Sequence, residues 1–123
     1  MIRIALCDDD PHFLQHLHQF VDKWFIEHKI VSSCTEYTSG VVLRDAQEAT
    51  SFDIFFLDIE MPKIGGMQLA KQIRESHPDS VIIFLTSHDE FAPDGYRVQA
   101  LRYLSKHTWK KYLSEALSAA MVQ

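Results

Sequence analysis

The stretch IFFLDIEMPKIGG, residues 54–66, combines a buried strand with a charged end. Its first four residues are apolar, as expected for a strand that is covered on both faces of a sheet. The strand stops on Asp58, and a carboxylate at such a place is costly unless it has a partner or a chemical role. Pro62 and the Gly65–Gly66 pair follow and predict a shaped loop, because glycine adopts backbone conformations closed to other residues.

Similar apolar runs recur along the chain and alternate with segments of helical periodicity. Strands are predicted at residues 2–7, 30–38, 53–57, 81–86 and 100–104. Helices are predicted at residues 11–28, 39–48, 66–76, 88–98 and 108–121. Asp10 and Ser39 are the predicted N-caps of the first two helices. The alternation predicts an α/β domain with a doubly wound, five-stranded parallel sheet in the order 2-1-3-4-5 and helices on both faces, a flavodoxin-like fold.

The bulk composition limits the class of protein. A chain of 123 residues, 46% of them hydrophobic, fits one globular domain over residues 1–123. The net charge of −5 argues against direct contact with nucleic acid, because phosphate contacts supply most of the affinity of duplex-binding domains. The apolar runs are too short to span a bilayer, and no secretory signal opens the sequence, so we expect a cytoplasmic protein without membrane contact. Cys7 and Cys34 are predicted to be buried free thiols.

Acidic residues end two strands that the predicted order makes neighbours. Asp8 and Asp9 end the first strand, and Asp58 ends the third. Two carboxylates about 4 Å apart repel by about 4 kcal/mol at an effective dielectric constant of about 20, so raised pKa values or a bound cation are expected. Oxygen ligands of this kind suit Mg²⁺. Thr86 and Lys106 follow the fourth and fifth strands at the same edge, which predicts a phosphoryl-transfer site with an aspartate nucleophile.

Four motifs in this order resemble the receiver domains of two-component response regulators: CDDD at residues 7–10, LDIEMPKIGG at 57–66, LTS at 85–87 and RYLSK at 102–106. The resemblance covers essentially the whole chain. It implies that Asp58 is the phosphoacceptor for a sensor histidine kinase. It also implies that Asp8, Asp9 and Asp58 hold Mg²⁺ together with the backbone carbonyl of Ile59.

The same resemblance implies a switch. Thr86 corresponds to the switch hydroxyl, Tyr103 to the switch aromatic residue, and Lys106 to the lysine that contacts the phosphate. Phosphorylation would be read out on the face formed by the fourth predicted helix, the fifth strand and the fifth helix, roughly residues 88–121. This face is also the predicted interface of a possible homodimer.

Three positions depart from the pattern or modulate it. The family commonly has proline after the lysine, in a cis peptide bond, whereas this chain has His107. A non-proline cis bond costs about 3 kcal/mol, so the Lys106–His107 bond is predicted to be trans. Glu60 and His88 occupy positions that flank the phosphoryl group in receivers and tune its lifetime.

The stretch EFAPDGYRVQALRYLSKH, residues 90–107, resembles the receivers of LytTR-type transcription regulators. Those regulators pair a receiver with a carboxyl-terminal DNA-binding domain. The 123 residues contain no such effector domain, so the chain is expected to be a fragment or a free-standing receiver that controls transcription through an attached or separate effector.

Other interpretations of these residues remain open. A phosphatase of the haloacid-dehalogenase type also uses a strand-end aspartate and Mg²⁺, but that family has a second aspartate where this chain has Glu60. An interaction module that is never phosphorylated is a further alternative. The aspartates also fit turns and N-caps, and Tyr103 fits ordinary packing. His12, His16 and His18 are interpreted as exposed helix residues, because no third metal ligand is placed with them.

Overall fold

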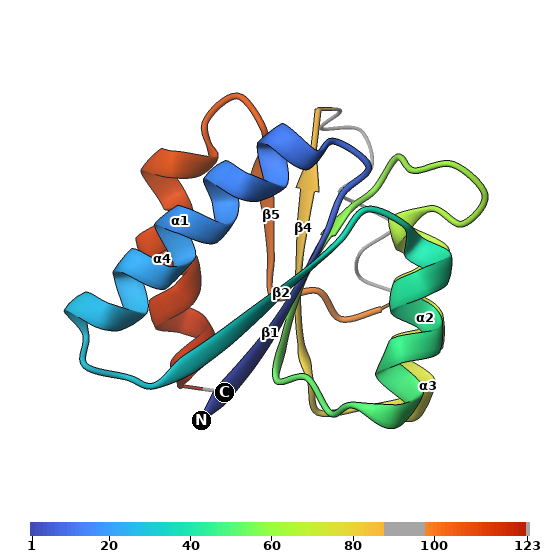
Figure 1. Cartoon of the computed structure of the whole chain (residues 1–123), viewed down its shortest axis with the longest axis horizontal. Helices are drawn as coiled ribbons and strands as arrows, with labels where there is room; N and C mark the ends of the chain where they lie inside the picture. The colour runs from blue at the N-terminus through green and yellow to red at the C-terminus, as the bar shows by residue number, and fades with distance from the viewer. Residues whose placement is uncertain (88–97, 123) are drawn as a thin grey trace.

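The computed structural model describes residues 1–87 and 98–122 (Figure 1). The strands in these ranges are β1 (Ile2–Cys7), β2 (Ser32–Tyr37), β3 (Ile54–Asp58), β4 (Val81–Thr86) and β5 (Arg102–Ser105). The helices are α1 (Pro11–Glu27), α2 (Gly40–Ala49), α3 (Gly66–Ser76) and α4 (Trp109–Met121). Helix α4 therefore corresponds to the last of the predicted helices. The helix predicted at residues 88–98 falls almost wholly on residues 88–97, which lie outside the described residues.

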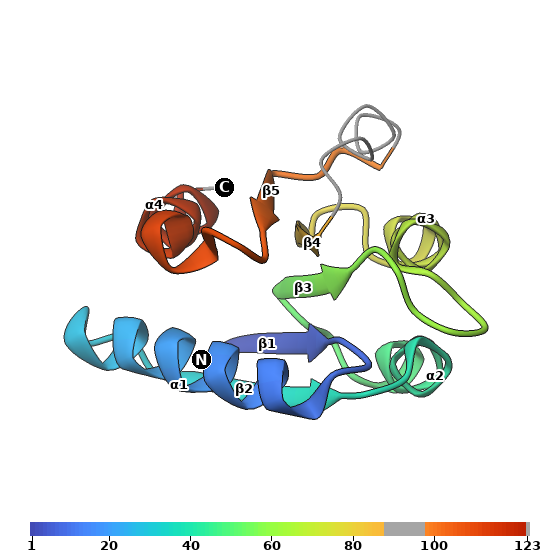
Figure 2. The ribbon, with the colours of Figure 1, turned by 90° about the horizontal axis from the view of Figure 1, so that it is seen from above.

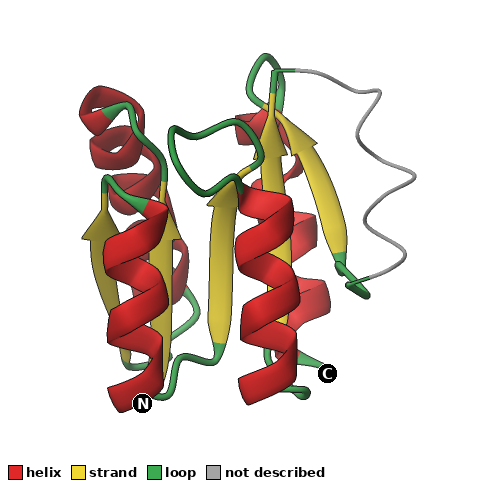
Figure 3. Ribbon diagram, turned by 90° about the vertical axis from the view of Figure 1, so that its right-hand side faces the viewer, coloured by secondary structure: helices red, strands yellow, loops and turns green. Residues whose placement is uncertain are grey.

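All five strands form one parallel sheet in the order β2-β1-β3-β4-β5, which confirms the predicted topology. Figure 3 shows the strand arrows running in the same direction, so their carboxyl ends share one edge. Strand β1 is central and pairs with both β2 and β3. Asp58 pairs with Leu85 at the end of β3, and Thr86 pairs with Ser105 at the end of β4. The sheet thus gathers the strand-end residues that the sequence singles out.

The helices cover the two faces of the sheet in pairs. Helices α1 and α4 lie on one face, and α2 and α3 lie on the other (Figure 2). Successive β1 side chains alternate between the two cores, because strand side chains point to opposite faces. Ile4 and Leu6 join the core under α1 and α4, whereas Ala5 and Cys7 join the other. Burial on both faces explains why β3 is buried at every position.

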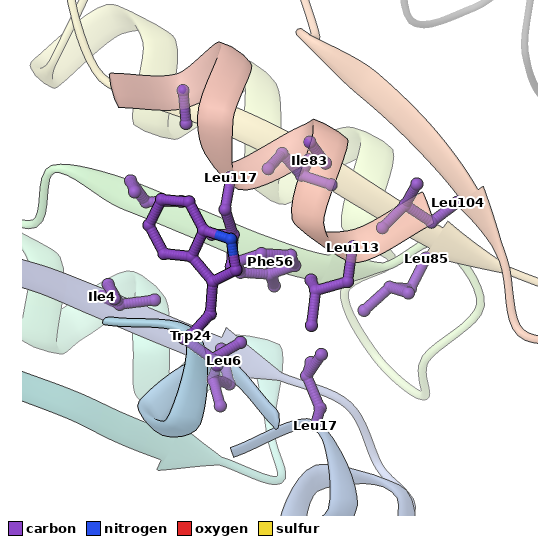
Figure 4. Packing of buried hydrophobic residues seen from close by; sticks show 14 of the residues in the cluster. Ile4, Leu6, Leu17, Trp24, Phe56, Ile83, Leu85, Leu104, Leu113 and Leu117 are labelled. Carbon is purple, nitrogen blue, oxygen red and sulfur yellow. The ribbon is translucent and has the colours of Figure 1, made fainter. Parts of the chain in front are cut away.

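The core under α1 and α4 is built around large side chains from both helices. Trp24 of α1 lies over Phe56 and beside Leu113 and Leu117 of α4 (Figure 4). Its indole Nε1 donates a hydrogen bond to the hydroxyl of Ser114 at 3.1 Å. Most of the apolar stripe of the first helix is therefore core, as its spacing predicts, but Phe20 is 39% exposed.

Helix starts follow the predicted capping. The Asp10 side chain accepts hydrogen bonds from the backbone N–H groups of His12 and Phe13, and Pro11 occupies the first turn. The Ser39 side chain accepts from the N–H of Val42 at the start of α2. The Asp10 side chain thus caps α1, unlike the neighbouring Asp8 and Asp9.

Several details differ from the sequence-based expectation. Strand β5 begins at Arg102, two residues later than predicted, because Ala100 and Leu101 precede the first residue that pairs with β4. Cys34 is half-buried instead of buried, since β2 is an edge strand. The Lys106–His107 bond is trans, as predicted. Among the described residues, no helix has the length and apolar character needed to cross a bilayer.

Candidate functional site

Three carboxylates meet at the carboxyl edge of the sheet. One carboxylate oxygen from each of Asp8, Asp9 and Asp58 lies within 4.8 Å of the others. Asp8 is 1% exposed and Asp58 is 4% exposed, whereas Asp9 is open to solvent. The predicted juxtaposition of the three side chains is confirmed, because β1 and β3 are direct neighbours. Together with Lys106, these residues are called the acidic edge below.

Lys106 brings a positive charge to the two buried carboxylates. Its Nζ lies 2.6 Å from Oδ2 of Asp8 and 3.3 Å from Oδ2 of Asp58. Its backbone N–H donates to the carbonyl of Thr86 at 2.8 Å, which fixes the start of the side chain beside β4. The ring of Phe13 lies 4.8 Å from Nζ and covers the ammonium from the α1 side. The strand order and the length of the lysine side chain thus allow Lys106 to contact both aspartates.

Burial dominates the electrostatics of the acidic edge. Burial, and then the charge of Asp8, raise the pKa of Asp58 to about 6, and Lys106 offsets only part of the shift. Burial likewise raises the pKa of Asp8. Burial lowers the pKa of Lys106, but its hydrogen bond to Asp8 and the two nearby carboxylates outweigh burial and raise that pKa overall. With Asp9 included, the site holds three carboxylates and one ammonium, so it favours a further cation.

Backbone N–H groups orient the two buried carboxylates. Oδ1 of Asp8 accepts from the N–H of Asp10 at 2.9 Å. Oδ1 of Asp58 accepts from the N–H of Glu60 at 3.3 Å. In both residues the other oxygen, Oδ2, faces Lys106. The carboxylate planes are therefore set by the loops that follow β1 and β3.

Gly66 lets α3 begin against the end of β3. Its N–H donates to the carbonyl of Ile59 at 2.9 Å. A Cβ at Gly66 would lie 2.1 Å from the backbone oxygen of Asp58, which leaves no room for any other residue. Gly65 has φ of −79° and Gly66 also has no positive φ, so the predicted need for special backbone angles is wrong at both glycines. Close approach of two backbone segments is the reason for Gly66.

Thr86 and Tyr103 lie on one face of the sheet. Thr86 is 3% exposed at the end of β4. Tyr103 is half-buried on β5, and its ring stacks on Phe84 with centroids 5.2 Å apart. Side chains alternate along β4, so Thr86 shares the face of Phe84. The two predicted switch residues thus share one face of the sheet, while His88 lies outside the described residues.

Some neighbours of the site carry no signal in the sequence. Phe13 was predicted only as part of the apolar stripe of the first helix, yet its ring also contacts Lys106 and, edge to face, Trp109 at 5.5 Å. Cys7 lies beneath the acidic edge, where burial and then the charge of Asp8 raise the pKa of its thiol to about 12. His12 and His16 are exposed as predicted, but His18 is half-buried and contacts two carboxylates.

Comparison with known proteins places these features in a family. The protein-family model of the response regulator receiver domain matches residues 4–118 of this sequence. The chain belongs to this family. This receiver domain is 31% identical over 119 residues to the positive alginate biosynthesis regulatory protein of Pseudomonas aeruginosa, covering 97% of the chain and 47% of that protein. It is 30% identical over 118 residues to the transcriptional regulatory protein BtsR of Escherichia coli, covering 96% of the chain and 47% of that protein.

Solved structures agree with the fold of this receiver domain. The response regulatory domain of mrkE from Klebsiella pneumoniae matches with a TM-score of 0.87 at 19% identity, over 98% of this chain and 96% of that one. The receiver domain of AraT from Geobacillus stearothermophilus matches with a TM-score of 0.84 at 25% identity, over 98% and 94% of the two chains. This receiver domain spans about half the length of the curated relatives it matches.

Proposed function

We propose that this receiver domain accepts a phosphoryl group on Asp58 from a sensor histidine kinase and changes its surface in response. The observation that carries the proposal is a buried carboxylate at the end of β3 that faces Lys106 and lies beside Asp8 and Asp9. Membership of the receiver family favours this function over that of a haloacid-dehalogenase-type phosphatase. The proposed catalysis is limited to phosphorylation and dephosphorylation of the domain's own Asp58.

Asp58 is the proposed nucleophile. Its Oδ1 is held by the N–H of Glu60, and Oδ2 attacks the phosphorus of a phosphohistidine. A new O–P bond forms as the N–P bond of the donor breaks, and that electron pair leaves with the imidazole. With a pKa of about 6, the carboxylate is mostly ionised at pH 7 and available for attack. Hydrolysis of the acyl phosphate later restores the free carboxylate.

The carboxylates of the acidic edge fit Mg²⁺. Three oxygen donors within 4.8 Å of one another, with an excess of negative charge, are the ligands that this hard cation prefers. Asp8, Asp9 and Asp58 would hold it, and bound Mg²⁺ would neutralise charge on the phosphoryl oxygens. The proposed fourth protein ligand is a backbone carbonyl. The Ile59 carbonyl already accepts the N–H of Gly66, so the carbonyl of the next residue, Glu60, is an alternative.

Lys106 is proposed to contact the phosphoryl group once Asp58 is phosphorylated. Its ammonium is anchored on Asp8 at 2.6 Å and is less closely bound to Asp58 at 3.3 Å. Modification of Asp58 places phosphoryl oxygens on that side of the ammonium. The contact with Asp8 holds the lysine in place for this exchange. Glu60 and His88 are proposed to tune the rate of hydrolysis.

Thr86 and Tyr103 are proposed to carry the signal away from Asp58. The phosphoryl group adds acceptor oxygens at the edge of the sheet, and the Thr86 hydroxyl ends the adjoining strand. Movement of Thr86 toward them would open space on the sheet face that it shares with Tyr103. The proposed readout face runs over residues 88–121, including β5 and α4, and is the proposed surface for a homodimer.

The proposed output is control of transcription. Two relatives are named as a biosynthesis regulatory protein and a transcriptional regulatory protein. The acidic charge of this chain makes direct DNA contact by the receiver itself unfavourable. We therefore propose an attached or separate effector, for which a LytTR-type domain is the candidate from the sequence of residues 90–107.

Phosphorylation by a small phosphodonor tests the proposal. Incubation with acetyl phosphate and Mg²⁺ should add one phosphoryl group that is labile to hydroxylamine, as measured by intact-protein mass spectrometry. Asp58→Asn should abolish the adduct, and Asp45→Asn, on the exposed surface of α2, should leave it unchanged. An adduct of equal yield in Asp58→Asn would disprove the assignment. No adduct in the wild type would favour an interaction module that is not phosphorylated.

A further inference from the structure

A second cluster of ligand-type side chains lies between α1 and the edge strand β2. His18 and Asp22 are four residues apart on α1 and therefore share one side of the helix. Cys34 and Glu36 are two residues apart on β2 and share one face of the strand. They pair with Ile4 and Leu6, which belong to the core that α1 covers. These four side chains are called the α1–β2 seam below.

The donor atoms of the seam are close enough to share one ion. One atom each from His18, Asp22 and Cys34 lies within 4.8 Å of the other two. Nε2 of His18 is 3.1 Å from Oδ2 of Asp22. Two ligands bound tetrahedrally at about 2.0–2.3 Å from zinc are about 3.3–3.8 Å apart, so small side-chain rotations would suffice. Imidazole, thiolate and carboxylate together favour Zn²⁺ over the hard Mg²⁺.

Each ring nitrogen of His18 faces a carboxylate, and Glu36 is the partner of Nδ1. Nδ1 of His18 lies 2.6 Å from Oε2 of Glu36, while Nε2 faces Asp22. A neutral imidazole has one N–H, so it can donate to only one of these carboxylates. Either the ring carries two protons and bridges both carboxylates, or a cation lies beside Nε2. In the second arrangement Glu36 accepts the Nδ1 proton, as carboxylates commonly do behind metal-binding histidines.

We propose that His18, Asp22 and Cys34 bind one zinc-type divalent ion, with Glu36 orienting His18 from outside the ligand set. A water molecule completes the tetrahedron, since the side chains of His18 and Asp22 are 28% and 44% exposed and open to solvent. The ion ties the middle of α1 to the edge of the sheet. This site shares no residue with the acidic edge and does not depend on phosphorylation of Asp58.

Cobalt binding tests the site through its sulfur ligand. Titration of the full chain with Co²⁺ in excess Mg²⁺ should give one sulfur-to-cobalt charge-transfer absorption that saturates at one ion per chain, and Zn²⁺ should remove it. Cys34→Ser should abolish the band. Cys7→Ala is the matched control and should keep it, because Cys7 lies beneath the acidic edge. Asp9→Asn should also keep the band, which separates this site from the acidic edge.

Two histidines of α1 provide a second matched pair. His18→Gln should weaken Co²⁺ binding about 100-fold or more, whereas exposed His16→Gln should leave it unchanged. Glu36→Gln should weaken binding by about 10–100-fold, as expected for loss of a carboxylate behind a metal-binding histidine. Equal weakening by His16→Gln and His18→Gln would show adventitious binding to surface histidines and would overturn the proposal.

A measurement on the wild-type chain does not depend on whether the variants fold. Zn²⁺ should slow alkylation of Cys34 by iodoacetamide and raise the thermal unfolding midpoint, with the modified cysteine located by peptide mass spectrometry. Absence of the cobalt band in the wild type, or its survival in Cys34→Ser, would mean that His18 only bridges two carboxylates as an ion pair. Either result refutes the metal site.

Discussion

The acidic edge and the α1–β2 seam both bring carboxylates against a nitrogen-bearing side chain, but they differ in burial. Asp8 and Asp58 are almost fully buried at the ends of central strands. Asp22 and Glu36 are 44% and 36% exposed on a helix and an edge strand. Water screens the charges of Asp22 and Glu36 far more than those of the buried Asp8 and Asp58. Interactions between carboxylates and a nitrogen-bearing side chain therefore affect the free energy of unfolding strongly at the acidic edge and only weakly in the seam.

The largest expected effect comes from the backbone that supports the acidic edge. Gly66→Ala should lower the free energy of unfolding by more than about 3 kcal/mol, because its Cβ would meet the Asp58 backbone oxygen at 2.1 Å. Urea unfolding followed by circular dichroism measures this. Gly65→Ala is the control and should cost less, since its nearest contact is 3.0 Å from the Ile59 oxygen. Equal costs would show that the start of α3 can move away from β3.

Removal of the lysine should have the next largest effect. Lys106→Met should lower the free energy of unfolding by about 2–3 kcal/mol at pH 7 with EDTA present, because two buried carboxylates lose their cation. Added Mg²⁺ should restore part of the loss if the carboxylates bind it. Lys110→Met, which removes an exposed lysine near Phe20, should change little. A loss in Lys106→Met no larger than in Lys110→Met would contradict the contrast between the two clusters.

Removal of the buried carboxylate should have the opposite sign. Asp58→Asn should raise the free energy of unfolding by about 1–2 kcal/mol at pH 7 without Mg²⁺, because the folded state no longer holds a desolvated charge beside Asp8. The pKa of Asp58 rises from 3.8 to about 6 on folding, so the folded state binds more protons in this range. The stability that this residue contributes is thus present below about pH 4 and lost as the pH rises through 6.

Urea unfolding across pH 4–7 measures this dependence. The decline of stability with rising pH should be smaller in Asp58→Asn than in the wild type, although Asp8 retains a contribution of the same sign. Asp45→Asn, at an exposed ion pair with Arg44, should keep the wild-type slope. An unchanged slope in Asp58→Asn would show that Lys106 compensates the buried charge fully.

The smallest expected effect lies in the seam. Without zinc, with EDTA present, His18→Gln should lower the free energy of unfolding by less than about 1 kcal/mol, because its two ion pairs are partly exposed. Moderate salt should further reduce the loss of unfolding free energy in His18→Gln. The loss in Lys106→Met should depend less on salt concentration. Urea unfolding at two salt concentrations measures both. A salt-insensitive loss of about 3 kcal/mol in His18→Gln would place the seam in the same class as the acidic edge.

Much of the acidic edge could be predicted from the sequence. Strand-end aspartates on the first and third strands must meet if those strands are parallel neighbours, and the pattern of strands and helices favours that order. The start of β5 was predicted two residues too early, because the apolar residues Ala100 and Leu101 precede the first paired residue, Arg102. The seam was missed. His18 was grouped with His12 and His16, although only His18 has Asp22 one turn later and faces β2.

Sequence patterns alone were enough to predict most of the strands and helices, the sheet order, the capping by Asp10 and Ser39, and the gathering of Asp8 and Asp58. These follow from local periodicity, from capping chemistry and from the handedness of parallel connections. The three-dimensional arrangement was needed to find that Lys106 contacts both aspartates while Phe13 covers it, and that α1 meets β2 in a cluster of four ligand-type side chains. Such contacts depend on how far side chains reach between elements that are distant in the chain, and no local pattern encodes that distance.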